Sequence, residues 1–286
     1  RKPDQSYPPD KLFHQSVVTR WNLERNLPYD WPRTSLFIEE DITMALDGQT
    51  ASRNNLGLYQ SSIQERIDWV VHRAHCQSVD FKCAGSWLER SNYMAQHPTA
   101  IAAFMCMDGR VNVPLVTNTP RGIILPFRNL GGQFDLGWPH FGEVVAETVE
   151  EVTTQAHKLL AIITYHYSKG DSHRGCAGFG YDTAAARAHA TQTVAQMESF
   201  FGRGRGIVYP LLCGLETDED AIVFHGHNGQ TLDLSTVQSP DEDQLSIQLG
   251  NLYPDMPHQM LRDLVPLASR NVAHIAEIRG VNRGKD

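Results

Sequence analysis

The sequence predicts an α/β fold with a central, largely parallel β-sheet flanked by helices and a helical region before it. Two observations support this. From residue 100 onward, short apolar runs typical of buried strands alternate with helical segments, which is the pattern of a parallel sheet. Between Ser61 and residue 97 the apolar residues follow a helical period. We therefore divide the chain into an N-terminal arm and helical region (1–97), an α/β domain (98–240) and a C-terminal helical extension (241–286).

The N-terminal region contains two kinds of pattern. Residues 1–60 are rich in proline, asparagine, aspartate and aromatic residues, which predicts extended arms and turns around one short helix near 36–46. From Ser61 onward, apolar residues recur at steps of three and four, which predicts an amphipathic helix with an apolar face. That face comprises Ile63, Ile67, Val70, Val71 and Ala74. A second helix is expected over 85–96.

The α/β region is bounded by turn-forming residues between its apolar runs. The run AIAAFMCM, for example, lies between His-Pro and Asp-Gly, so it is expected to be a buried strand. The predicted strands are 100–107, 122–127, 159–166 and 206–215, the predicted helices are 142–158, 183–201 and 267–278, and a hairpin is expected over 220–235 around Asn228-Gly229.

Composition excludes several classes of function. The formal net charge is −8, which makes the chain a poor general ligand for nucleic acid or an anionic membrane. No apolar run reaches the roughly 18 residues needed to cross a bilayer. The five cysteines form an odd, sparse set that argues against a disulfide framework. They fit cytoplasmic thiols, some of them bound to metal.

Two predicted strand ends carry residues that could bind metal. Cys106 ends the first strand, and the stretch HYSKGDSHRGC (166–176) follows another, with Cys176 at its end. Because the carboxyl ends of parallel strands meet at one edge of a sheet, these residues are expected to converge. Two thiolates and one imidazole make a three-ligand zinc site with an open position for water, whose pKa such a site lowers to about 7.

An acidic and a basic residue follow Cys106 at a spacing of two, Asp108 and Arg110. A carboxylate paired with a guanidinium stays ionised and keeps one orientation. Next to zinc, Asp108 could accept a hydrogen bond from bound water and orient it toward a substrate. A plain structural ion pair is the alternative interpretation.

Taken together, CMDGR, RNLGG at 128–132 and YHYSKGDSHRGCAGFG resemble the β-class carbonic anhydrases, and most closely the carboxysomal (carboxysome shell) carbonic anhydrase family. The resemblance covers about residues 98–230, where LLCGLETDEDAI is also similar. It implies a carbonic anhydrase that uses zinc (Zn2+) held by Cys106, a histidine and Cys176, with Asp108 and Arg110 as catalytic residues and CO2 and bicarbonate as substrates.

The resemblance also implies partners and a location. We expect a homodimer or higher homo-oligomer in the cytoplasm, within a carboxysome-type microcompartment, with the N-terminal arm available for contact with the carboxysome shell or Rubisco. Members of the family extend further beyond the hairpin than residues 240–286 of this chain, which argues against packaging in a carboxysome and favours pairing between separate chains.

The identity of the histidine ligand stays open between two residues. His173-x-x-Cys176 has the spacing found in ordinary β-class enzymes, whereas His166 ends the strand LLAIITYH. A strand end gives a metal ligand more rigid support than a loop does, and Gly170-Asp171 can form a turn that brings Cys176 back. We therefore favour His166 and keep His173 as the rival ligand.

Two other functions fit the same residues. One is a hydrolase for carbonyl sulfide or carbon disulfide on the same zinc fold. The other is a zinc-stabilised, non-enzymatic scaffold or shell-binding protein whose N-terminal arm would dock. The retention of Asp108 and Arg110 argues against a scaffold, because a structural zinc site does not need that pair.

The remaining candidate groups have simpler explanations. His72, His75, Cys76 and Cys83 could form a second metal cluster, but a helix with partly buried histidine and cysteine explains them better. We interpret Cys213 as core, His225 and His227 as part of a polar turn, and Asp218, Glu219 and Asp220 as solvated loop charges.

Overall fold

A computed structural model of the chain describes residues 60–155, 157–202 and 206–280. The chain divides into two compact units, Arg1–Arg73 and Ala74–Asp286. The predicted helix near 36–46 and the aromatic arm lie outside the described residues. No helix among the described residues is both long and apolar enough to span a membrane.

The second unit contains a single six-stranded sheet, and it confirms the predicted fold class. The strand order is β2-β1-β3-β4-β5-β6. The first four strands in that order are parallel, and β5 and β6 are antiparallel. The bounds are β1 Ala100–Cys106, β2 Ile124–Asn129, β3 Leu159–Tyr167, β4 Val208–Glu216, β5 Ala221–His225 and β6 Thr231–Asp233.

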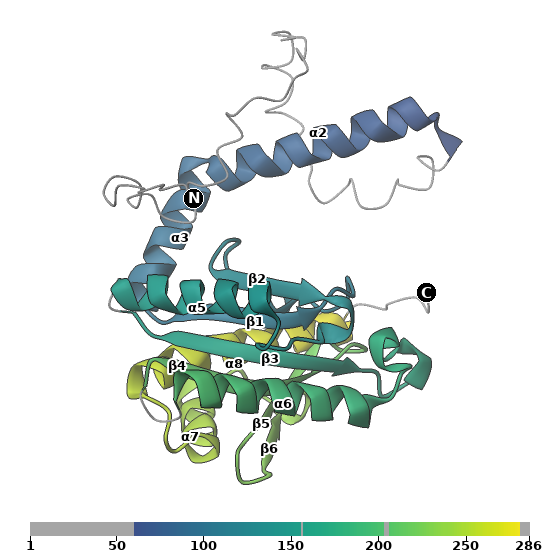
Figure 1. The fold of residues 1–286 in the computed structure, drawn as a ribbon. Coiled ribbons are helices and arrows are strands. Elements are labelled where there is room, and N and C mark those ends of the chain that lie inside the picture. The colour runs from purple at the N-terminus through teal and green to yellow at the C-terminus, as the bar shows by residue number, and fades with distance from the viewer. Residues whose placement is uncertain (1–59, 156, 203–205, 281–286) are drawn as a thin grey trace, which may run out of the picture. The chain divides into compact units, whose positions relative to one another are not determined.

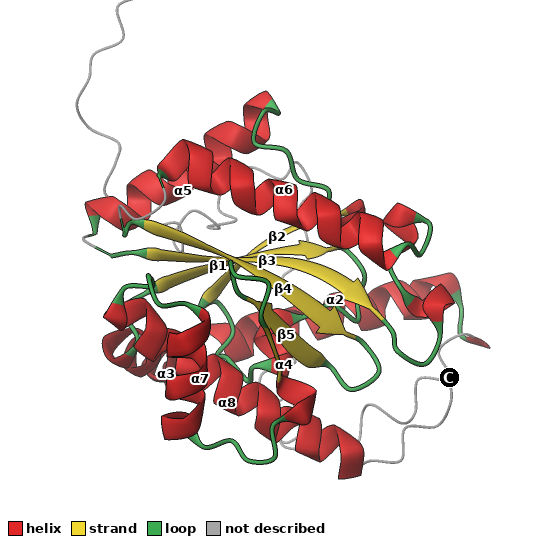
Figure 2. Ribbon diagram, turned by 90° about the horizontal axis from the view of Figure 1, so that it is seen from below, coloured by secondary structure: helices red, strands yellow, loops and turns green. Residues whose placement is uncertain are grey.

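Helices cover both faces of this sheet (Figure 2). Helices α5 (Pro139–Thr154) and α6 (Thr183–Phe201) pack on one face, and Figure 1 shows them lying along the strands. Helices α3 (Ala84–Gln96), α4 (Val113–Val116), α7 (Glu242–Leu252) and α8 (His258–Gly280) lie on the other face. This double cover explains why β1 and β3 are almost continuously apolar.

The core on the α5 face is an aromatic cluster that fixes β1 just before its functional end. Phe104 stacks on Phe127 of β2 with ring centroids 4.6 Å apart. Phe134 and Phe141 meet Phe104 edge-on at 5.5 and 6.2 Å. Offset and edge-on aromatic contacts of this kind add stability beyond area burial, so the end of β1 is held firmly.

Most predicted elements are confirmed, and the differences have local causes. Helix α5 begins at Pro139, earlier than the predicted 142, because proline suits the first turn of a helix. It ends at Thr154 rather than 158, which leaves a short connection before β3. Helix α8 begins at His258, nine residues before the predicted start at 267. It continues through Pro266 because most of its middle turns are buried, and this packing outweighs the lost backbone hydrogen bond.

Helix α2 (Ile63–Lys82) confirms the helical periodicity but not the burial that such a face suggests. None of its residues is buried, and Ile63, Ile67, Val70 and Val71 are all exposed. The apolar residues at helical spacing therefore predicted the helix correctly, but the spacing did not predict whether its apolar face is buried.

A buried asparagine ties α8 to the sheet. Asn271 is fully buried. Its Nδ2 donates to the carbonyls of Val116 (3.0 Å) and Asp220 (2.9 Å), and its Oδ1 accepts from the backbone N–H of Ile222 at 2.9 Å. One side chain thus satisfies three backbone groups from three segments, and such groups are expensive to leave unpaired.

Replacing Asn271 with alanine tests this connection. Asn271→Ala should lower the free energy of unfolding by about 2–4 kcal/mol, because it leaves buried carbonyls and an N–H without partners. Urea unfolding followed by circular dichroism measures the change. The exposed Asn251 of α7 provides the control, and an equal loss in Asn251→Ala would contradict the explanation.

Candidate metal centre

Three potential metal ligands converge at the carboxyl edge of the sheet. Cys106 is the last residue of β1, His166 lies near the end of β3, and Cys176 follows β3 after a loop. Their ligand atoms all lie within 4.8 Å of one another, and all three side chains are buried. Among the described residues, no other group of His, Cys, Asp or Glu meets this geometry.

The spacing of the two sulfurs fits a tetrahedral metal ion. The Sγ atoms of Cys106 and Cys176 are 4.0 Å apart. Two thiolates bound to one zinc at about 2.3 Å with tetrahedral angles would be about 3.8 Å apart. The pair therefore needs almost no rearrangement to share one ion.

Neither ring nitrogen of His166 has a hydrogen-bond partner within the part of the chain that the structure describes. Its exposed fraction is 1%, and both Nδ1 and Nε2 are buried without a hydrogen bond. An unpartnered buried polar group is costly. A metal ion bound to one ring nitrogen would remove part of that cost, which makes the donor set chemically consistent with a metal site.

The local hydrogen bonds favour a thiolate at Cys106. The Cys176 thiol and the backbone N–H of Asp108, 3.4 Å from Cys106 Sγ, both lower the pKa of Cys106. The same sharing raises the pKa of Cys176, because its proton is held between the two sulfurs. A cation at this point would stabilise both thiolates together.

The structure separates the two candidate histidines. His166 lies with both cysteines, whereas His173 is not part of the group. The His173 side chain is 83% exposed, and its Nδ1 lies 3.4 Å from the Asp171 carboxylate. His173 belongs to a short 3-10 turn, Ser172–Arg174, which directs it to solvent.

Asp108 and Arg110 form a bidentate pair beside the three ligands. Asp108 Oδ1 accepts from the backbone N–H and Nε of Arg110 at 2.9 and 3.1 Å, and Oδ2 accepts from Nη2 at 2.7 Å. The hydrogen bonds from Arg110 lower the pKa of Asp108. Asp108 is therefore an ionised acceptor with a fixed orientation.

Two glycine-containing turns meet next to the cysteines. The 3-10 turn η4 (Leu130–Gly132) contains Gly131 and Gly132, both at positive φ. It contacts the 3-10 turn η6 (Ala177–Phe179), where a Cβ on Gly178 would lie 2.6 Å from the Cα of Gly131. The RNLGG segment therefore shapes the surroundings of Cys176, and its glycines permit a backbone contact that no side chain would allow.

The loop between His166 and Cys176 is held by a carboxylate from the end of β4. Asp218 accepts hydrogen bonds from Ser168 Oγ at 2.9 Å and from the backbone N–H of Gly170 at 2.8 Å. The fully buried Glu216 accepts from the N–H of Lys169 at 3.2 Å. These contacts anchor the loop before it returns to the metal ligands.

The interpretation of Asp218, Glu219 and Asp220 as solvated loop charges is therefore wrong for two of the three. Asp218 binds the loop, and Asp220 is buried with its Oδ2 3.1 Å from His274 Nε2. Glu219 alone is paired at the surface, with Arg279. The signal that could have identified them is the position at a parallel strand end, where Cys106 and His166 also lie.

The remaining candidate residues have structural roles or lie apart. Cys213 is buried in β4, as expected for core. His225 is buried rather than part of a polar turn, and it contacts Tyr165. His72 and Cys76 of α2 do not belong to any group with metal-binding geometry among the described residues.

Comparison with known proteins finds a family match over just under half of the chain. Residues 138–278 match the family model described as Carboxysome Shell Carbonic Anhydrase, catalytic domain. The matched segment contains His166 and Cys176, whereas Cys106, Asp108 and Arg110 precede it. No curated protein matches the chain.

Several solved structures are similar to this chain. The β-carbonic anhydrase CcaA is 12% identical, over 59% of this chain and 92% of its own, with a TM-score of 0.42. CafA, a β-carbonic anhydrase of Aspergillus fumigatus, is 15% identical, over 65% of this chain and 98% of its own, with a TM-score of 0.36. A tetrameric β-carbonic anhydrase from Sordaria macrospora is 12% identical, over 63% and 98%, with a TM-score of 0.28.

Substitution at the glycine contact tests how tightly the site is packed. Gly178→Ala should lower the free energy of unfolding by about 1–3 kcal/mol, because the added methyl group overlaps the backbone of Gly131. Gly109→Ala, in the Asp108–Arg110 loop, is the matched control because nothing lies within 4 Å of its Cβ position. Chemical unfolding measures both, and equal values would show that the contact is not tight.

Proposed function

We propose that the chain is a zinc-dependent carbonic anhydrase that interconverts CO2 and bicarbonate, because residues 138–278 match the catalytic-domain model of the carboxysome shell carbonic anhydrases. The observation that carries the proposal is the buried Cys106–His166–Cys176 group, whose ligand atoms lie within 4.8 Å of one another. Three protein ligands leave one position of a tetrahedral ion open, which is the arrangement of catalytic rather than structural zinc.

Zinc would be held by the Sγ atoms of Cys106 and Cys176 and by one ring nitrogen of His166. When bound, it supplies Lewis-acid chemistry that makes water a nucleophile near neutral pH. All three ligands are buried, so exposed side chains elsewhere on the protein cannot reach the ion and replace them.

Asp108 would select and orient the reacting oxygen. Because Arg110 keeps it ionised, Asp108 can accept hydrogen bonds but cannot donate them. It therefore favours an O–H group, such as water or the hydroxyl of bicarbonate, and disfavours an unprotonated oxyanion. Arg110 uses three donors on Asp108, so its role is to hold this carboxylate in place.

Exposed apolar residues beside the site support association with a second chain. Met107 and Leu130 directly follow the ends of β1 and β2, and both are exposed. Exposed apolar groups at such a position favour a subunit contact, so the proposal includes a homodimer or higher homo-oligomer. Residence in the cytoplasm within a carboxysome-type microcompartment, and contact with the shell or Rubisco, are proposed from the family alone.

Metal content of two histidine variants tests the ligand set. Purified protein should contain one zinc per chain, and His166→Ala should lose it because both cysteines alone bind zinc weakly. His173→Ala is the matched control and should retain zinc. Elemental analysis after dialysis measures the content. Zinc lost only in His173→Ala would overturn the assignment.

Stopped-flow CO2 hydration tests the reaction and the role of Asp108. Asp108→Asn should keep its zinc but lose at least about tenfold in kcat, because the amide can donate a hydrogen bond and no longer enforces one orientation of water. Asp68→Asn, at an exposed position of α2, should be unchanged. Zinc-loaded wild-type protein that does not hydrate CO2 would contradict the proposed function, and sulfide release from carbonyl sulfide or carbon disulfide would then identify a different hydrolase.

A further inference from the structure

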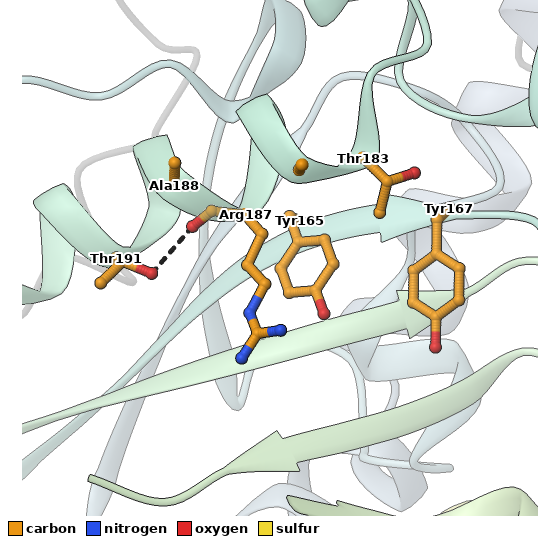
Figure 3. Close-up of a pocket in the computed structure, with 7 residues that line it drawn as sticks. Tyr165, Tyr167, Thr183, Arg187, Ala188 and Thr191 are labelled. Atoms are coloured by element: carbon orange, nitrogen blue, oxygen red, sulfur yellow. Dashed lines mark hydrogen bonds between the residues drawn. The ribbon is translucent and has the colours of Figure 1, made fainter. Parts of the chain in front are cut away.

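A cavity lies on the sheet face covered by α6, and none of the three candidate metal ligands lines it. It has a volume of about 500 Å³, lies between the carboxyl half of β3 and the first turns of α6, and opens to solvent along α6. Figure 3 shows Arg187 extending from α6 toward the sheet beside Tyr165, with Thr183 above and Tyr167 further along the strand. A volume of this size is within the range of small-molecule sites.

The floor of the cavity is formed by two stacked tyrosines. Tyr165 and Tyr167 have ring centroids 5.9 Å apart and nearly parallel planes. Gly214 of β4 makes room for them, because a Cβ there would lie 2.9 Å from Tyr165 Oη. The rings, together with Ala184 and Ala188 of α6, give the cavity a largely apolar wall that could accept the uncharged body of a ligand.

A hydrogen-bonded pair of neutral groups lies beneath Arg187. Tyr165 Oη is 2.9 Å from Nε2 of the buried His225. Burial, and then the charge of Arg187, lower the pKa of His225 to about 4, while burial raises the pKa of Tyr165 to about 12. Both groups are therefore uncharged at neutral pH, and neither neutralises the guanidinium.

Arg187 provides an uncompensated positive charge at this end. Among the described residues, no carboxylate forms an ion pair with its guanidinium. The backbone carbonyl of Arg187 accepts a hydrogen bond from Thr191 Oγ1, which leaves the guanidinium uninvolved. The other end of the cavity is different, because Asp233 and Glu216 act on Tyr167 and, after burial, help to raise its pKa. An anionic group would therefore be attracted to the Arg187 end.

We propose that this cavity binds a small organic anion, a carboxylate or a phosphate ester, through Arg187 and Tyr165. Arg187 contributes charge-assisted hydrogen bonds from a planar donor set that suits both anions, and Tyr165 contributes its hydroxyl. The apolar body of the ligand would lie on the tyrosine rings. Because Tyr165 and Tyr167 flank His166 in β3, the ligand would contact the strand that carries a candidate metal ligand, from the opposite side.

Calorimetric titration of the full chain with three related probes tests the proposal. Benzoate and phenyl phosphate share one ring and differ in their anionic group, and benzamide is the uncharged counterpart. At least one anion should bind, and benzamide should bind at least about tenfold more weakly, since it lacks the charge for Arg187. The anion that binds more tightly distinguishes a carboxylate site from a phosphate site.

Variants of the cavity make the test specific. Arg187→Gln should raise the Kd of the anion at least about tenfold, and Arg187→Lys should restore part of the affinity. The exposed Arg121 provides the matched control, since Arg121→Gln removes the same charge elsewhere. Ala188→Leu should also block binding, because it fills the cavity from an exposed position and leaves every charge in place.

Three outcomes would overturn the proposal. They are no binding of either anion at millimolar concentration, equal binding by wild type and Arg187→Gln, and binding that disappears when zinc is removed but persists in Arg187→Gln. The last would assign the anion to the metal centre. Because binding is measured directly, the result does not depend on whether the chain hydrates CO2.

Discussion

Parallel pairing of β1 with β3 is the constraint on which the rest of the site depends. The pairing aligns Phe104 with Ile163, and the hydroxyl of Thr164 donates to the carbonyl of Phe104 at 3.0 Å. Cys106 lies two residues beyond Phe104 and His166 two residues beyond Thr164, so both lie at the same edge of the sheet. No loop needs to adopt an unusual path to bring the first thiol and the imidazole together.

The third ligand depends on contacts that come from elsewhere. Cys176 approaches the other two only because the loop after β3 is held by Asp218 from β4 and because Gly178 can touch Gly131. The candidate metal centre is therefore supported by β1 and β3 directly and by β2 and β4 through their terminal loops. Four adjacent parallel strands, each contributing at its carboxyl end, explain why the site lies where general rules for α/β sheets place binding sites.

The sequence was sufficient for the fold class because alternation of apolar runs with helical segments leaves few arrangements. It also predicted that Cys106, Asp108 and Arg110 belong to the candidate site, since a thiol and a charged pair at a strand end stand out against an apolar run. It favoured His166 but could not exclude His173, because that choice depends on the path of a loop fixed by the distant Asp218. For the same reason Asp218 and Asp220 were misinterpreted, since a charge run gives no sign of its partners.

The cavity beside α6 shows a further limit of sequence reasoning. Its charge comes from a helix and its floor from a strand, and Gly214 contributes only by lacking a side chain. Nothing local connects these residues. Helix α2 shows a different limit. Its apolar residues recur at a clear helical spacing, but this spacing does not say whether another element covers them, and none of its residues is buried.

The separation of the two sulfur ligands along the chain has a consequence for folding kinetics. Cys106 and Cys176 are 70 residues apart, so the centre is made of some of the most non-local contacts in the sheet. Contacts of this kind form slowly, because a long segment must be closed before they contribute. A metal ion that binds all three ligands would stabilise the folded state, in which they are already together, rather than the transition state for folding. Its main effect would then be to slow unfolding, with little change in the rate of folding.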